Sequence, residues 1–143
     1  MPELTLASFN VHWGLGHHRH GFPPFDVAAA CETFDADVIV LQESWAPDGG
    51  ISQHDEVAAR LGMQCVAVPL ARSSLKAKPH LVGRAVATAT PGEGSWCLGL
   101  LSRKPIRSTR TVEPRQLCLD PCPRLLLHAE VDVDGTNLTV VAT

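Results

Sequence analysis

Asp35-Ala36-Asp37-Val38-Ile39-Val40-Leu41-Gln42-Glu43-Ser44 is the stretch of sequence that decides the fold of this chain. Its four consecutive large aliphatic residues, bounded by aspartates and by a polar cluster, predict a strand that is fully buried. The strand delivers Glu43 to its carboxyl end, which is where open α/β sheets bind their ligands. A second interpretation stays open at this point, because Glu43 could merely be a polar residue that follows a strand.

The segments before this stretch complete a strand, helix and strand unit. Leu4–Asn10 alternates apolar with small or polar residues, which predicts a first strand that ends near Asn10. Apolar residues at helical spacing predict a helix over Pro24–Phe34, with Pro24 in its first turn. The strands of such a unit are parallel neighbours or near neighbours, joined by a right-handed crossover. Asn10 and Glu43 are therefore expected at the same edge of one sheet.

The rest of the chain changes from alternating helices and strands to strands alone. A second helix is predicted over Gln53–Leu61, with Gly62 as its left-handed cap. Residues 70–94 show no sustained period, apart from a weak strand at 85–89. The predicted strands are Met63–Val68, ended by Pro69, then Trp96–Ser102, Ile106–Val112, Arg124–Val133 and Leu138–Ala142, with a hairpin at Asp134-Gly135. This order predicts a single α/β (α+β) domain over residues 1–143.

Composition is that of an ordinary soluble protein. Hydrophobic residues make up 45% of the 143 residues, and no apolar run reaches the length of a membrane span. The Met-Pro-Glu start lacks a secretory pattern, so we expect a cytoplasmic location. The five cysteines are scattered, odd in number and mostly embedded in apolar runs, which favours free thiols over a disulfide framework.

Two polar clusters allow more than one interpretation. His17-His18-Arg19-His20 could bind a metal, but adjacent side chains on a loop rarely all point inward, and no carboxylate or cysteine lies among them. Residues 70–127 carry ten basic and three acidic residues, although the whole chain has a net charge of -3. This basic region could face phosphate or be a solvated loop region, and its lack of interleaved aromatic residues disfavours nucleic-acid contact.

Three segments, in this order, resemble the endonuclease/exonuclease/phosphatase superfamily, which includes pancreatic deoxyribonuclease, abasic-site endonucleases, sphingomyelinases and inositol-phosphate phosphatases. The segments are Ala7–Val11, Asp37–Ser44 and Gly99–Ile106, and the Leu-Gln-Glu-Ser pattern within the second is the most specific. A fourth segment, Arg124–Thr143, is similar to the Arg-led strand and hairpin of that family. The resemblance implies a four-layer α/β/β/α sandwich with mixed sheets and metal-dependent hydrolysis of phosphodiesters or phosphomonoesters.

The resemblance also implies a site. Glu43 matches the metal-binding glutamate of the family, Asn10 matches an asparagine near metal and phosphate, and Arg124 matches, more weakly, an arginine that contacts phosphate. The implied catalytic residues are thus Asn10, Glu43 and Arg124, and the implied metal ligands are Glu43 and Asn10. The implied metal is Mg²⁺, with Mn²⁺ as the alternative, because Mg²⁺ prefers one or two carboxylates together with substrate phosphate. The implied partner is a phosphate-ester substrate, either nucleic acid or a small phosphoester.

The chain departs from the family pattern at its end. It stops at Val140–Thr143, where the family continues into a Thr-His or Asn-His step and then into Gly-Asp-x-Asn and Ser-Asp-His segments. We therefore expect the N-terminal half of a phosphoesterase, inactive as this fragment and prone to self-association through an uncovered sheet face. The alternative is a non-enzymatic fragment, or a module that binds anionic ligands through Arg103, Lys104, Arg107 and Arg110.

Overall fold

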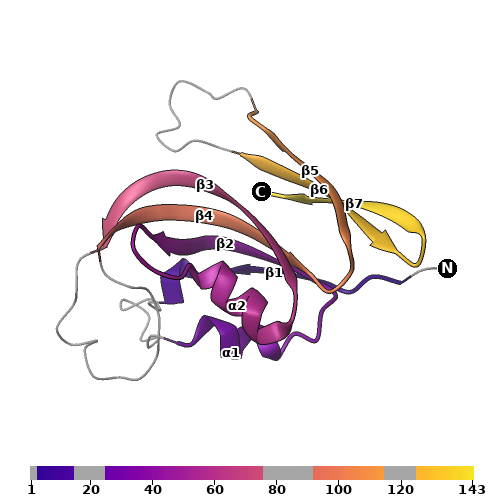
Figure 1. Cartoon of the computed structure of the whole chain (residues 1–143), viewed down its shortest axis with the longest axis horizontal. Helices are drawn as coiled ribbons and strands as arrows, with labels where there is room; N and C mark the ends of the chain where they lie inside the picture. The colour runs from indigo at the N-terminus through magenta and orange to yellow at the C-terminus, as the bar shows by residue number, and fades with distance from the viewer. Residues whose placement is uncertain (1–2, 15–24, 76–91, 115–124) are drawn as a thin grey trace.

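The computed structural model describes residues 3–14, 25–75, 92–114 and 125–143, and Figure 1 shows their arrangement. In chain order the elements are β1 (Leu6–Asn10), the 3-10 turn η1 (His12–Gly14), α1 (Val27–Glu32), β2 (Val38–Pro47), α2 (Gln53–Leu61), β3 (Gln64–Leu75), β4 (Gly92–Ser102), β5 (Ile106–Val112), β6 (Leu126–Val133) and β7 (Thr136–Ala142). Within these described ranges, no helix is long and apolar enough to cross a membrane.

The strands form two sheets whose inner faces pack on each other. Sheet A has the order β1-β2-β4-β3, and sheet B has the order β5-β6-β7. β1 and β2 are parallel neighbours, with Asn10 opposite Gln42, which confirms the predicted strand, helix and strand unit. All other neighbouring strands are antiparallel, so sheet A is mixed.

The helices and the two sheets lie in successive layers. α1 and α2 cover the face of sheet A that is turned away from sheet B (Figure 1). The described residues thus form three layers: the helices, sheet A and sheet B. This arrangement confirms the predicted mixed α/β fold with two facing sheets. A second helical layer on the far side of sheet B stays a prediction, as does the single domain over residues 1–143.

The aliphatic run of β2 is buried on both faces, as its composition predicts. Ile39 and Leu41 pack in the core between sheet A and the helices, whereas Val38 and Val40 pack in the core between the sheets. None of the four is more than 3% exposed. Because full burial of such a side chain stabilises a fold by about 1.5–3 kcal/mol, this one strand anchors all the described layers.

Helix α2 has the predicted bounds, but the boundaries around α1 differ from the prediction. α1 begins after Asp26, whose side chain accepts a hydrogen bond from the Ala29 N–H at 3.0 Å, and it ends at Glu32. β2 begins at Val38 because Asp35 has a left-handed φ of 44°, which breaks the extended backbone. The predicted helix over Pro24–Phe34 was therefore too long, whereas the strand begins with the predicted aliphatic run and extends beyond it to Pro47.

The prediction that Pro69 ends a strand is wrong. β3 continues to Leu75 along β4, with a register shift between Pro69 and Ala71. β3 is an edge strand, so the missing Pro69 N–H costs no ladder bond on the side away from β4. β4 correspondingly begins at Gly92, before the predicted Trp96. The weak strand predicted at 85–89 lies outside the described residues.

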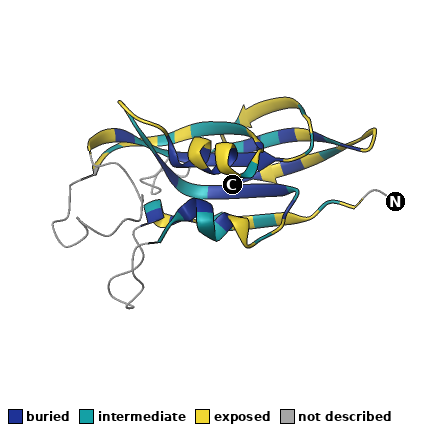
Figure 2. Cartoon of the chain, turned by 60° about the horizontal axis from the view of Figure 1, so that its bottom comes forward, coloured by how far each residue is buried: buried dark blue, intermediate teal, exposed yellow. Residues whose placement is uncertain are grey.

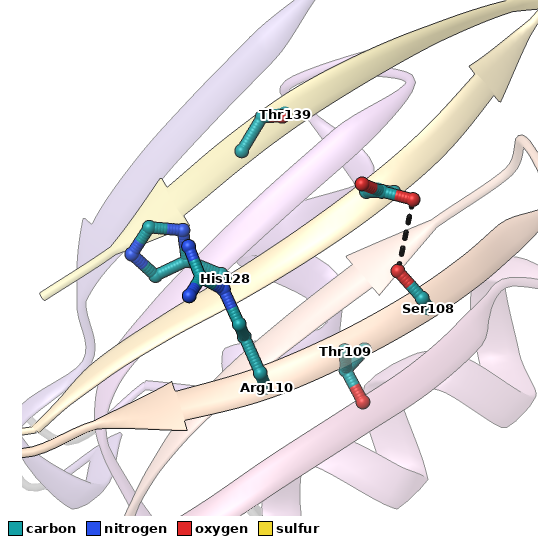
Figure 3. A pocket seen from close by; sticks show the side chains of 6 residues that line it. Ser108, Thr109, Arg110, His128 and Thr139 are labelled. Atoms are coloured by element: carbon teal, nitrogen blue, oxygen red, sulfur yellow. Dashed lines mark hydrogen bonds between the residues drawn. The ribbon is translucent and has the colours of Figure 1, made fainter.

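Sheet B presents a polar outer face. β6 alternates buried Leu127, Ala129, Val131 and Val133 with more exposed neighbours, an alternation that Figure 2 shows along the strands. On the outer face, six polar residues surround a pocket of about 180 Å³: Ser108, Thr109, Arg110, His128, Glu130 and Thr139 (Figure 3). The predicted hairpin is confirmed, since Asp134 and Gly135 both have a positive φ.

The described cysteines are free thiols, as predicted. Burial raises the pKa of Cys31 and Cys97 to about 11 and that of Cys65 to about 12. At neutral pH these thiols are therefore protonated, and they act as small apolar side chains. Cys118 and Cys122 lie outside the described residues.

Gly94 of β4 lies tightly against β2. A Cβ at this position would lie 2.4 Å from the Ala46 carbonyl oxygen and 2.6 Å from Trp45 Cζ2. We expect Gly94→Ala to lower the free energy of unfolding by about 2 kcal/mol, measured by urea denaturation, because the strands must separate to admit the methyl group. Gly49→Ala is the control, since a Cβ there meets no atom within 4 Å. Equal effects of both substitutions would contradict this packing.

Candidate functional site

Glu43 lies at an irregularity inside β2, and the strand continues past it to Pro47, so the prediction that Glu43 stands at the carboxyl end of the strand is wrong. The pairing of β2 with β4 shifts register between Leu41 and Ser44, and Glu43 has a φ of 56°. A left-handed backbone costs a residue other than glycine about 1–2 kcal/mol, so neighbouring contacts must hold it. Irregularities of this kind re-aim a side chain in a strand. Here the bulge brings the Glu43 side chain to Asn10 at the end of β1.

The Glu43 carboxylate is held by two nitrogen atoms. Asn10 Nδ2 donates a hydrogen bond to Glu43 Oε1 at 2.9 Å, and His12 Nδ1 lies 3.1 Å from Glu43 Oε2. The His12 N–H donates to Asn10 Oδ1 at 3.0 Å, which fixes the orientation of the Asn10 amide. The prediction that Asn10 and Glu43 come together is therefore confirmed, although they meet where β1 ends beside the interior of β2 rather than where both strands end.

His12 is the member of this site that the sequence did not reveal. It follows Asn10-Val11 directly, but it also begins residues 12–24, whose His, Gly and Pro content predicts an irregular loop rather than a site residue. In the structure η1 folds back, with His12, Trp13 and Gly14 all at positive φ. The turn lays the His12 ring on Trp13, with a centroid separation of 5.3 Å and an interplanar angle of 17°. A single histidine after a predicted strand does not indicate that the backbone will turn in this way.

A group of tryptophans supports the turn. The Trp13 and Trp96 ring centroids are 3.9 Å apart, and Trp96 meets the fully buried Trp45 edge to face at 6.1 Å. Trp13 Nε1 is buried and finds no hydrogen-bond partner among the described residues. The turn is therefore held by ring contacts and by its backbone rather than by the indole N–H.

The first turn of α2 clamps the bulge and the turn together. Gln53, which is 4% exposed, accepts a hydrogen bond from the Trp45 N–H at 2.9 Å and donates one to the Trp13 carbonyl at 2.8 Å. One side chain thus joins the strand that carries Glu43 to the turn that carries His12. Ser52 caps the helix N-terminus and places Gln53 at its first position.

A second buried contact from α2 fixes the strand after Glu43. Ser44 Oγ donates to the Cys97 carbonyl at 3.2 Å and lies 3.1 Å from His54 Nδ1. Since the Ser44 hydroxyl proton goes to Cys97, His54 is the donor in this pair. Burial lowers the pKa of His54, which keeps its ring neutral.

The oxygen atoms at this edge fit a hard divalent cation. Glu43 and His12 have side chains that are 41% and 48% exposed, so an ion can reach them. Each carboxylate oxygen keeps a lone pair beyond its present hydrogen bond, and Asn10 Oδ1 keeps one beyond the His12 N–H. Among the described residues, no three His, Cys, Asp or Glu side chains gather at one point.

The other residues that the sequence pointed to are either outside the described ranges or paired elsewhere. Arg124 and the His17-His18-Arg19-His20 cluster lie outside the described residues. Three bases of the basic region pair with acids elsewhere: Arg103 with Asp35, Lys104 with Asp134 and Arg107 with Asp132. Pairing with Arg107, together with the Gly135 N–H, lowers the pKa of Asp132. These bases are therefore partly neutralised on the surface.

Removing the Gln53 side chain should lower the stability of the chain, because this side chain joins β2 to η1. Gln53→Ala leaves the Trp45 N–H and the Trp13 carbonyl without this partner, so we expect the free energy of unfolding to fall by about 2–4 kcal/mol. Equilibrium urea denaturation measures the change. Gln64→Ala is the matched control, because exposed Gln64 accepts one bond from the Ile106 N–H and should cost about 1 kcal/mol or less. A smaller loss for Gln53→Ala than for the control would argue against the clamp.

His54 should make stability depend on pH. The folded chain holds the pKa of His54 below its usual 6.5, so the unfolded chain binds more protons in the window below that value. The free energy of unfolding should therefore decrease as pH falls from about 7.5 to 5.5. His54→Gln should flatten this dependence, which chemical denaturation at several pH values would measure. An unchanged slope in the variant would assign the effect to other groups.

Comparisons with known proteins identify the family and the fold of the chain. Residues 7–140 match the model of the Endonuclease/Exonuclease/phosphatase family. A crystal structure of an endonuclease/exonuclease/phosphatase from Beutenbergia cavernae DSM 12333 superposes with a TM-score of 0.61 at 21% identity, covering 99% of this chain and 37% of that chain. A family protein from Leptotrichia buccalis C-1013-b gives a TM-score of 0.57 at 10% identity, covering 99% of this chain and 53% of that one.

At these identities the two structures establish likeness of fold alone. The chain spans 37% and 53% of their respective lengths. No curated protein is significantly similar to the chain in sequence. The family match nevertheless covers at least part of each of the seven described strands, and it includes the positions of Asn10 and Glu43. The chain belongs to the endonuclease/exonuclease/phosphatase family.

Proposed function

We propose that this chain carries the metal-binding part of a phosphoesterase site, which hydrolyses a phosphodiester or phosphomonoester with Mg²⁺ or Mn²⁺. The observation that carries the proposal is the Asn10 Nδ2 to Glu43 Oε1 contact of 2.9 Å, at the place where β1 ends beside β2. This contact sets an accessible carboxylate beside an amide oxygen, and both are ligand types that Mg²⁺ prefers.

The residues of the chain have distinct parts in this proposal. Glu43 would hold the ion through its carboxylate, and Asn10 would hold Glu43 in place while offering the remaining lone pair of Oδ1. When bound, a divalent ion neutralises phosphate charge and lowers the pKa of a bound water. Arg124 would contact the phosphate, as the family resemblance implies. Because the Asn10 amide is fixed by the His12 N–H, the carboxylate is oriented before any ion arrives.

We further propose that hydrolysis needs groups in addition to these, so that this 143-residue chain by itself is inactive. At the described edge, Glu43 is accompanied by Asn10 and His12 rather than by further carboxylates. The family structures that superpose on the chain are longer than it, since it covers 37% and 53% of them. Self-association and a cytoplasmic location stay predictions.

The alternative of an anion-binding module has less support. It relies on Arg103, Lys104, Arg107 and Arg110, of which the first three form ion pairs with aspartates. A bound anion would have to compete with those carboxylates. The outer face of sheet B is also polar and of mixed charge, since Glu130 lines the same pocket as Arg110 and His128.

Replacing the carboxylate should remove the ion. We expect Glu43→Gln to weaken Mn²⁺ binding by at least about tenfold, measured by isothermal titration calorimetry, because the amide removes the negative charge that attracts the ion. Glu130→Gln on sheet B is the control and should leave binding unchanged. Hydrolysis of a chromogenic phosphodiester and phosphomonoester is measured alongside. Robust turnover by the unmodified chain, lost in Glu43→Gln, would overturn the proposal that additional groups are needed.

A further inference from the structure

The position of His12 points to a role beyond holding the carboxylate. Glu43 is already fixed by Asn10 Nδ2 at Oε1, and His12 approaches the other oxygen, Oε2, at 3.1 Å. The imidazole is 48% exposed and therefore reachable from solvent. Imidazole nitrogen is also the commonest protein ligand for divalent transition metals.

We propose that His12 Nδ1 is a second protein ligand of the divalent ion, and that the site therefore prefers Mn²⁺ to Mg²⁺. This inference rests on the proposed metal site at Glu43. It adds a nitrogen donor to a site for which the family resemblance implies oxygen ligands alone.

The separation of the two donor atoms suits a shared ion. Neighbouring ligands around an octahedral ion with bonds of about 2.1 Å are about 3.0 Å apart. The distance of 3.1 Å between His12 Nδ1 and Glu43 Oε2 is close to this value. An ion shared by both atoms would take the place of this hydrogen bond, and Nδ1 and Oε2 would turn from each other toward the ion.

The ring is set in this position by contacts that do not involve Glu43. It stacks on Trp13 at 17°, and Trp13 is anchored through its carbonyl to Gln53. The His12 backbone is fixed by its N–H bond to Asn10 Oδ1. The imidazole is therefore held beside the carboxylate by the fold itself, as a preorganised ligand requires.

The ligand types determine which ion the site selects. Mg²⁺ demands oxygen ligands and gives up its waters reluctantly, whereas transition metals accept imidazole readily. In a site with one carboxylate, one amide oxygen and one imidazole, the imidazole nitrogen thus raises the affinity for Mn²⁺ more than the affinity for Mg²⁺. Loss of the imidazole should cost Mn²⁺ affinity selectively.

Pulsed electron paramagnetic resonance of the full chain loaded with Mn²⁺ tests the inference directly. A directly bound imidazole gives a ¹⁴N coupling, which we expect in the unmodified chain and not in His12→Asn. Asparagine is chosen because it tolerates the left-handed φ of 41° at this position. His128→Asn is the matched control, since His128 lies on the outer face of sheet B, and it should keep the coupling.

Affinity measurements give a second readout. Calorimetry should show that His12→Asn weakens Mn²⁺ binding by at least about tenfold while changing Mg²⁺ binding by less than about threefold. If His12→Asn fails to fold by circular dichroism, labelling the unmodified chain with ¹⁵N-histidine replaces it, and the ¹⁴N pattern should change to that of ¹⁵N.

The outcomes separate this inference from the proposed function. Mn²⁺ that binds through Glu43 without any histidine nitrogen coupling would overturn the role of His12 and leave the proposed metal site intact. A coupling that persists in folded His12→Asn would assign the nitrogen to another histidine and overturn the inference as well. Binding that is unaffected by Glu43→Gln would overturn both proposals.

Discussion

The carboxylate of Glu43 is available at the sheet edge only because the backbone of β2 leaves regular strand geometry at that residue. A φ of 56° is unfavourable for glutamate, and it persists because the two residues that follow are held by hydrogen bonds to neighbouring segments. Ser44 is fully buried between Cys97 and His54, and Trp45 is tied to Gln53. The candidate site therefore depends on hydrogen bonds from the first turn of α2, although α2 supplies no group to the site itself.

The same clamp couples the two halves of the site. Gln53 holds the backbone of β2 with its oxygen and the turn after β1 with its nitrogen, so Glu43 and His12 are set by one side chain. Because Gln53 is almost completely buried, breaking either bond leaves a polar group without water. Strain at the functional edge is thus balanced by the core beneath it, where Leu41 and Leu101 are fully buried.

The sequence predicted those features that follow from periodicity and strand order. Four aliphatic residues identified the central strand, and the strand, helix and strand unit brought Asn10 to Glu43 because its two strands are parallel neighbours. The sequence did not predict that β2 continues past Glu43 to Pro47. It did not predict the continuation of β3 past Pro69, because pairing with β4 outweighs the local signal of proline. His12 and Gln53 were missed for a related reason, since their roles arise from contacts between residues 31 and 40 positions apart.

The central claim is that a divalent ion binds where Glu43, Asn10 and His12 meet. All three tryptophans of the sequence lie at this end of sheet A, so their indole N–H signals in ¹H–¹⁵N spectra report on it. The most direct measurement is the titration of ¹⁵N-labelled chain with Mn²⁺, which broadens signals of nearby nuclei. The account predicts that the three indole signals and the amides of residues 10–13 and 42–45 broaden first. Broadening centred instead on Asp132 and Asp134 in the hairpin of sheet B would contradict it.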